Sequence, residues 1–163
     1  MIGRATSDLH LSERTALYVF NALAELRNDA AERGGDTVLV GDILDQPENV
    51  HMPTYNRLRD ELQAFPGMVF VLAGNHDQYR GYRNALEGLA GVNVIVVSEP
   101  EWTSMGLMIP YTPAAEFWTT VENQLKNKPK TMNCPNVWWT HQGWKGAYLN
   151  NMVKDRDGLT PAR

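Results

Sequence analysis

The sequence predicts an α/β protein in which helices cover a mainly parallel sheet. Short runs rich in valine, isoleucine and leucine alternate along the chain with longer segments whose apolar residues recur at helical spacing. A helix between two strands gives the chain the length it needs to return to the same edge, so that successive strands run parallel. The length of the chain is a third observation, because 163 residues suit a single domain over residues 1–163.

The first half of the chain is expected to contain three strands and two helices. In chain order these are a strand at residues 2–6, a helix at 12–33, a strand at 36–42, a helix at 53–65 and a strand at 68–74. Ser12 is the candidate cap of the first helix, and Gly34 with Gly35 stops it. Pro66 ends the second helix, because proline cannot continue a helical backbone.

The second half is expected to add two more helices, two strands and a hairpin. In chain order these are a short helix at residues 83–91, a strand at 92–97, a hairpin at 101–111, a helix at 113–127 and a strand at 136–144. Gly106 marks the turn of the hairpin. Pro113 suits the first turn of its helix, where a missing N–H costs nothing. The alternation of strands and helices therefore continues to the last strand.

Composition favours a soluble cytoplasmic protein. The formal net charge of −4 gives no broad basic surface for nucleic acid, although a metal-centred cleft can supply local positive charge. Cys134 is the only cysteine, which excludes an internal disulfide and favours a reducing compartment. No apolar run reaches membrane-spanning length and the N-terminus lacks the apolar region of a signal peptide, so no membrane partner is expected.

Polar side chains gather where four of the predicted strands end. They are Asp8 and His10 after the first strand, Asp42 after the second, Asn75 and His76 after the third, and His141 after the last. Taken alone, a pair such as Asp8 and His10 also fits ordinary turn chemistry. The run Gly74-Asn75-His76-Asp77 is a stronger signal, since chance gives it roughly once in seven hundred chains of this composition. Because ligands bind beyond the carboxyl ends of parallel strands, these side chains are expected to share one edge of the sheet.

The chemistry of these side chains indicates a metal site. Carboxylates, an amide oxygen and imidazoles, without any thiolate, suit Mn²⁺, iron or Zn²⁺. An aspartate at a neighbouring strand end can bridge two ions with its two oxygens. Two ions about 3.5–4 Å apart clamp a phosphoryl group and activate water, so that no protein nucleophile is needed. The sequence thus favours hydrolysis of a phosphate ester.

Four stretches of the chain resemble, in order and approximate spacing, the motifs of calcineurin-like metallophosphoesterases. These are "SDLHLS", "VGDILDQP", "LAGNHDQY" and "WTHQGW". The segment "GDILDQPENV", followed by a helix, is most similar to the SbcD-type nuclease branch of that family. The resemblance covers essentially the whole chain and implies a layered α/β/β/α sandwich. It also implies a phosphate-ester substrate, with phosphodiesters first and DNA among the candidates.

The resemblance further implies two divalent metal ions, with Mn²⁺ first and iron or Zn²⁺ as alternatives. Asp8 and His10 would bind the first ion, Asp42 would bridge, and Asn75 and His141 would bind the second. His76 would steady or protonate the leaving oxygen, and Asp77 would orient His76. Two further residues are left open: Asp45 either supports the site or is a plain turn residue, and Tyr111 either packs in the core or rims the cleft.

One departure from the family pattern concerns the C-terminal part of the site. The family has a Gly-His-x-His element after the strand of His141, and this chain has no histidine beyond His141. The chain is therefore expected to be a family domain without its C-terminal portion. The alternatives are a fragment, a site completed by a second chain or by another copy in a homo-oligomer, and a degenerate site on a non-catalytic scaffold.

Overall fold

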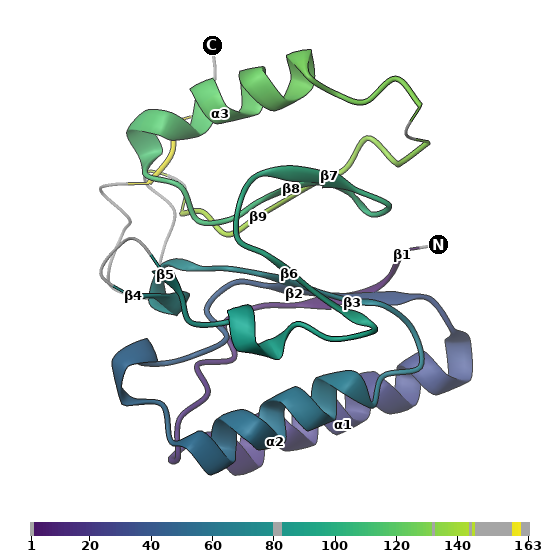
Figure 1. The fold of residues 1–163 in the computed structure, drawn as a ribbon, viewed down its shortest axis with the longest axis vertical. Coiled ribbons are helices and arrows are strands. Elements are labelled where there is room, and N and C mark those ends of the chain that lie inside the picture. The colour runs from purple at the N-terminus through teal and green to yellow at the C-terminus, as the bar shows by residue number, and fades with distance from the viewer. Residues whose placement is uncertain (1, 80–82, 132, 144, 146–157, 161–163) are drawn as a thin grey trace.

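The computed structural model describes residues 2–79, 83–131, 133–143, 145 and 158–160. Its helices and strands form four layers in the order helix, sheet, sheet, helix (Figure 1). Helices α1 (Ala16–Arg33) and α2 (Met52–Gln63) cover the outer face of the first sheet, and α3 (Ala114–Lys126) covers the outer face of the second. The structure confirms the predicted α/β class and the layered α/β/β/α arrangement.

The first sheet consists of parallel strands in the order β1-β2-β3-β6. They are β1 (Ile2–Thr6), β2 (Asp36–Val40), β3 (Val69–Leu72) and β6 (Val94–Val97). Helix α1 connects β1 to β2 and α2 connects β2 to β3, as the sequence predicts. Because the strands run parallel, the polar segments that follow β1, β2 and β3 leave the sheet at the same edge.

The second sheet contains the predicted hairpin and the last predicted strand. Its strands are β7 (Glu101–Thr103), β8 (Gly106–Ile109) and β9 (Trp138–Thr140), in that order. β7 and β8 are antiparallel and turn at Gly106, whose φ of +114° is readily adopted only by glycine. β9 follows α3 and pairs parallel to β8. Trp144, at the end of the predicted strand, lies outside the described residues.

Three clusters of buried side chains fill the spaces between the four layers. Alternate residues of the first sheet point to opposite faces, so that Leu39 packs toward α1 and α2 while its neighbour Val38 packs toward the second sheet. Met108 of β8 belongs to the middle cluster. The outer cluster joins Leu107 of β8 to Phe117 of α3. Packing between the two sheets therefore sets how their strand ends face each other.

Two predicted helices differ from the structure. The first begins at Ala16 rather than at residue 12, and Ser12 is not its cap. Instead Thr15 Oγ1 accepts the Ser12 N–H at 2.9 Å and donates to the His10 carbonyl at 2.7 Å, which closes a separate turn before the helix. The helix predicted at residues 83–91 is wrong. Asn84 Oδ1 accepts the Leu86 N–H, a local bond that competes with helical bonding.

The segment after β3 forms short elements. β4 (Gln78–Tyr79) and β5 (Arg83–Asn84) make a small antiparallel sheet. The segment also contains the short 3-10 helices η2 (Asn75–Asp77) and η3 (Glu87–Leu89). A further 3-10 helix, η1 (Pro47–Asn49), lies between β2 and α2. Among the described residues, no helix has both the length and the apolar character needed to cross a membrane.

Candidate metal centre

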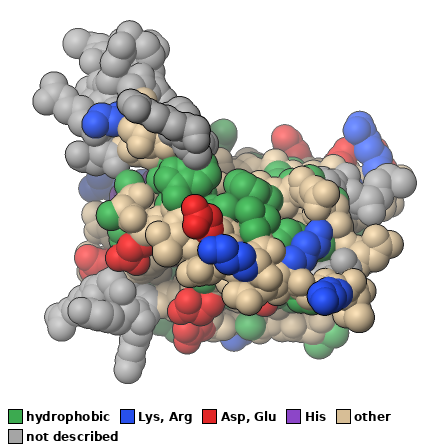
Figure 2. Space-filling view, turned by 90° about the horizontal axis from the view of Figure 1, so that it is seen from above, with side chains coloured by type: hydrophobic (Ala, Val, Ile, Leu, Met, Phe, Trp, Pro, Cys, Tyr) green, Lys and Arg blue, Asp and Glu red, His purple; other side chains and the backbone are tan. Residues whose placement is uncertain are grey.

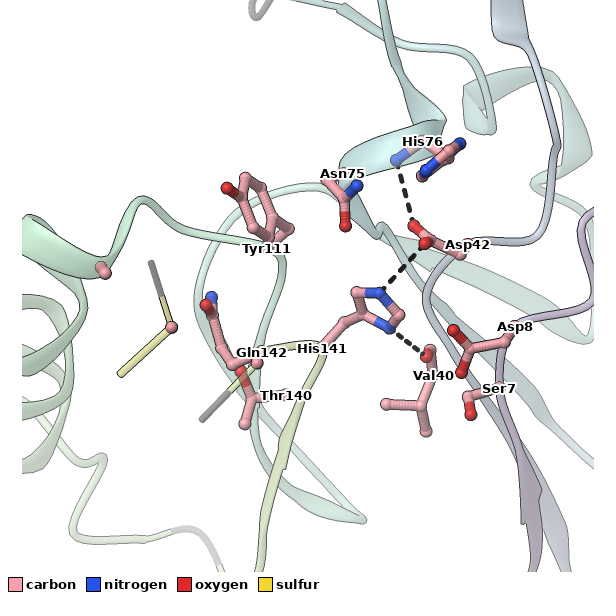
Figure 3. A pocket seen from close by; sticks show the side chains of 13 residues that line it. Ser7, Asp8, Val40, Asp42, Asn75, His76, Tyr111, Thr140, His141 and Gln142 are labelled. Carbon is pink, nitrogen blue, oxygen red and sulfur yellow. Dashed lines mark hydrogen bonds and ion pairs between the residues drawn. The ribbon is translucent and has the colours of Figure 1, made fainter. Parts of the chain in front are cut away.

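The polar strand ends surround one cavity of about 630 Å³ at the edge where the two sheets meet (Figure 3). Its wall includes Asp8, Asp42, Asn75, His76 and His141, which come from four different strand ends. The structure thus brings together these residues, which are far apart in the sequence. His10 lies beside these residues but does not line the cavity.

Asp42 is the most central of these side chains and is only 5% exposed. Its Oδ1 accepts the main-chain N–H of His76 at 3.0 Å. Its Oδ2 lies 3.2 Å from His141 Nε2 and 3.9 Å from His10 Nε2. Burial alone would raise the pKa of Asp42, but the hydrogen bonds from His141 and His76 outweigh burial and lower the pKa below its ordinary value. Asp42 is therefore an ionised carboxylate that faces three other segments.

His141 reaches this carboxylate from the second sheet. Its Nδ1 donates to the Val40 carbonyl at 2.9 Å, which directs Nε2 toward Asp42 (Figure 3). Burial would lower the pKa of His141, but the bonds to Asp42 and Val40 raise it to about 9. A metal ion requires a neutral imidazole, so an ion at this nitrogen would displace the proton that His141 Nε2 shares with Asp42 in a hydrogen bond.

The main chain at the site adopts unusual conformations. Asp8, His10 and Asp42 have φ values of 56°, 45° and 50°. These values lie in the left-handed region, which residues other than glycine rarely adopt. Such residues cost on the order of 1–3 kcal/mol each and persist only where the surrounding structure holds them. The side chains of these three residues form one group of potential metal ligands, so the strained main chain coincides with the candidate site.

Two glycines allow the site to be compact. A Cβ atom on Gly41, whose φ is +74°, would overlap the ring of His141. A Cβ atom on Gly74 would overlap the carboxylate of Asp42. The glycines in the Gly41-Asp42 and Gly74-Asn75 pairs are therefore needed for close approach as well as for turning the chain.

The structure corrects the expected role of Asp77. Its fully buried carboxylate accepts the main-chain N–H groups of Gly74, Leu44 and Ile43 at 2.8, 2.9 and 3.2 Å. It therefore ties the loop after β2 to the loop after β3 and does not orient the ring of His76. Burial raises the pKa of Asp77 above its usual value, against the lowering effect of the three N–H donors.

The ring of His76 is held by a different residue. His76 Nδ1 lies 3.0 Å from the main-chain carbonyl of Asp45. A carbonyl accepts hydrogen bonds only, so Nδ1 is the donor and Nε2 is the nitrogen left for another partner. The main chain of Asp45 thus contacts a residue of the candidate site, as expected if Asp45 supports that site. Tyr111 is half-buried and lines the cavity opposite Asp42 and His141 (Figure 3).

The donor set fits a divalent cation. One ligand atom from each of Asp8, His10 and Asp42 lies within 4.8 Å of the others. In the part of the chain that the structure describes, His10 Nδ1 is buried and has no hydrogen-bond partner. Asn75 and His141 line the same cavity without belonging to this group of three. Two carboxylates and one imidazole are ligands that Mn²⁺, iron and Zn²⁺ accept.

Comparisons with known proteins identify the family of this chain. The family model described as calcineurin-like phosphoesterase matches residues 5–154. No curated protein sequence gives a match. Among the solved structures that match is the nuclease MPE of Pseudomonas putida, with 23% identity and a TM-score of 0.47 over 67% of this chain and 54% of that one. The chain thus spans about half the length of that nuclease. Because the family model covers most of the chain, the protein belongs to the calcineurin-like phosphoesterase family.

Proposed function

We propose that this protein is a metal-dependent phosphoesterase that hydrolyses phosphodiesters. The observation that carries the proposal is the position of Asp42, a buried carboxylate with one oxygen toward His10 and His141 and the other bonded to the main chain of His76. Two divalent ions in this cavity would polarise the phosphoryl group and lower the pKa of the attacking water. Mn²⁺ is the first candidate, with iron and Zn²⁺ as alternatives.

The ligand roles are those that the resemblance to the family implies. Asp8 and His10 would hold one ion, Asn75 and His141 would hold the other, and Asp42 would contribute to both. The bond from His141 Nδ1 to Val40 supports this assignment, because it leaves Nε2 for the ion. His10 Nε2 is 3.9 Å from the nearest carboxylate oxygens of Asp8 and Asp42, so modest side-chain rotations close the set around a cation.

His76 acts on the leaving group in this proposal. Its side chain is exposed at the mouth of the cavity, and the Asp45 carbonyl fixes the proton of Nδ1. When the ring is protonated, Nε2 carries a second proton, which it can donate to the departing oxygen. Asp77 contributes indirectly, because it fixes the loop that carries His76.

The proposed substrates are phosphodiesters, with DNA among them. A cavity of about 630 Å³ is larger than a phosphate group requires and falls in the range of sites for whole small molecules. Lysine and arginine side chains lie among acidic and hydrophobic ones on the face formed by α3 (Figure 2). Affinity for a polyanion is therefore expected to come from the metal cavity rather than from that face.

The test is hydrolysis of a chromogenic phosphodiester, the matching monoester and labelled single-stranded DNA by metal-stripped protein with Mn²⁺, Fe²⁺ or Zn²⁺ added back. Asp42→Asn should reduce turnover by a factor on the order of 10² or more, because it removes a charged ligand. Asp60→Asn, an exposed carboxylate on α2, is the matched control and should keep full activity. Equal turnover with a chelator present, or in Asp42→Asn, would refute the proposal.

A further inference from the structure

A second group of potential ligands lies beside the central one. One ring nitrogen from each of His10 and His76 and one carboxylate oxygen of Asp45 all lie within 4.8 Å of one another. The two rings meet edge to face, with centroids 5.0 Å apart. His10 therefore belongs to two groups, one with Asp8 and Asp42 and one with Asp45 and His76.

The main chain fixes this second group in place. His10 donates its N–H to the Asp42 carbonyl at 2.9 Å, and Asp45 donates its N–H to the Leu11 carbonyl at 3.2 Å. The loops after β1 and β2 thus run side by side. The third loop is joined to the second by the carboxylate of Asp77. The three ligand side chains accordingly project from segments that are already held together.

We propose that His10, Asp45 and His76 form an alternative cation position that takes Zn²⁺. Two imidazoles and one carboxylate are the protein ligands of many zinc sites that keep a fourth position for water. The central group has two carboxylates and one imidazole, a set that suits Mn²⁺ better. The two positions therefore differ in the metal they prefer.

The geometry requires little movement. Donor atoms around a tetrahedral Zn²⁺ with bonds of about 2.0–2.1 Å are about 3.4 Å apart. The present separations of at most 4.8 Å close to this value by rotations of the exposed His76 and the half-buried Asp45. The bond from His76 Nδ1 to the Asp45 carbonyl leaves Nε2 as the ligand, an arrangement typical of metal-bound histidine.

Occupancy of this position has a consequence for the reaction, and this step rests on the function proposed above. A cation on His76 Nε2 removes the nitrogen that would serve the leaving oxygen. It also draws on His10, which the central group needs. Zn²⁺ is therefore expected to inhibit the Mn²⁺-supported reaction by engaging Asp45 and His76.

The binding test is residue-resolved modification of histidines by diethyl pyrocarbonate, followed by mass spectrometry, on the full metal-stripped chain. Zn²⁺ should protect His76, whereas Mn²⁺ at the same occupancy of the protein should leave it reactive. His51 is exposed and outside both groups, so it serves as the internal control. Reactivity of His76 that persists when the protein is saturated with Zn²⁺ would overturn the proposal.

Variants of acidic residues identify the ligand. Asp45→Asn keeps the carbonyl that holds His76 but weakens the metal ligand, so the Zn²⁺ concentration that protects His76 should rise at least about tenfold. Glu48→Gln, on η1, is the matched control and should leave that concentration unchanged. Identical protection curves for Asp45→Asn and the parent would refute the role of Asp45.

A kinetic measurement separates this inference from the proposed function. For each variant, the rate with Mn²⁺ and Zn²⁺ is divided by its own rate with Mn²⁺ alone. Asp45→Asn should need at least about tenfold more Zn²⁺ for the same inhibition. If the chain hydrolyses none of the substrates, the modification experiment still decides whether the zinc position exists. If hydrolysis is robust and Zn²⁺ never protects His76, the zinc position is refuted and the function stands.

Discussion

The pair formed by Asp42 and His141 places a negative and a positive charge side by side when no metal is bound. His141 Nε2 is 3.2 Å from Asp42 Oδ2, and both side chains are largely buried. Each charge offsets part of the cost of burying the other. The pKa of Asp42 falls and that of His141 rises to about 9 for this reason. A metal ion must therefore replace a proton, and metal affinity should increase with pH.

The stability of the metal-free protein should fall as the pH rises from about 6.5 to about 9. The folded state raises the pKa of His141 from 6.5 to about 9, so the stabilisation is complete below 6.5 and is lost as the pH passes through 9. A shift of this size corresponds to at most about 3 kcal/mol. Urea denaturation in chelator at several pH values measures it.

The control for this pH dependence is the Asp42→Asn variant, which removes the partner of His141 and should flatten the profile. His51→Gln alters an exposed histidine and should retain the parent slope. A profile in Asp42→Asn as steep as that of the parent would mean that other groups cause the loss.

The Asp77→Asn variant should lose stability while the ring of His76 keeps its position. An amide would turn one NH₂ toward a main-chain N–H, leaving at least one buried donor unpaired at a cost of about 1–3 kcal/mol. Urea denaturation measures this loss, and the histidine resonances of His76 in the NMR spectrum report its ring. Asp60→Asn should stay within about 0.5 kcal/mol of the parent. Unchanged stability in Asp77→Asn would contradict the tying role.

At the scale of elements, the strand-to-loop turns determine how closely the ligands approach. Gly41 follows β2 with a φ of +74°, and Gly34 follows α1 with a φ of +67°. No atom lies within 4 Å of a Cβ built on Gly34, whereas one on Gly41 overlaps His141. The two glycines therefore share a positive φ and differ in their surroundings.

This contrast provides a matched pair of variants. Gly34→Ala should cost on the order of 1–3 kcal/mol, because a φ of +67° with a ψ of −171° is a conformation that residues with a Cβ rarely adopt, and it should leave metal binding unchanged. Gly41→Ala should incur the same cost and also displace His141, so its affinity for Mn²⁺ should fall at least about tenfold. Equilibrium dialysis measures the affinity. Equal affinities in the two variants would show that His141 does not depend on the space left by Gly41.

The elements also show what the sequence could predict. The strands of the two main sheets and the three long helices were predictable from the pattern of their apolar residues, whereas the short strands β4 and β5 were not. The helix expected at residues 83–91 failed because a local bond from Leu86 to Asn84 and the pairing of β5 with β4 outweigh helical propensity.

The candidate site was predictable as a set of residues but not as a set of contacts. Polar residues at strand ends indicate which side chains share an edge, and all of the predicted ones except His10 line the cavity. Adjacency in sequence suggested that Asp77 supports His76, yet consecutive residues on a tight turn point in different directions. The carbonyl of Asp45, which holds His76, lies in another loop, and no sequence pattern marks a main-chain acceptor.

At the scale of the whole molecule, the candidate site spans both sheets. Asp8, Asp42 and Asn75 follow strands of the first sheet, whereas His141 follows β9 of the second. The bond from His141 to Val40, and one from the Tyr111 N–H to the Ala73 carbonyl at 2.8 Å, join the strand ends of the two sheets. The packing between the sheets therefore sets the distance between Asp42 and His141.

Core variants on the two sides of the first sheet should separate stability from metal binding. Met108→Ala, between the sheets, and Leu62→Ala, beneath the helices, should each cost about 2–5 kcal/mol. Only Met108→Ala should also weaken Mn²⁺ binding. Only this variant removes packing between the sheets, so that the second sheet, which carries His141, can shift relative to Asp42 on the first. Dialysis at a temperature where both variants are folded measures the difference. Equal affinities would show that the sheets hold their relation without Met108.

The position of His141 also has a consequence for synthesis of the chain. Roughly 65 residues separate it from His76, so at about 5–20 residues per second the ribosome adds it some 3–13 s later. During that interval the nascent chain already carries Asp8, His10 and Asp42 without the imidazole that will neutralise Asp42. Until β9 is synthesised, the carboxylate of Asp42 therefore lacks its positively charged partner, and His141, which follows β9, supplies it.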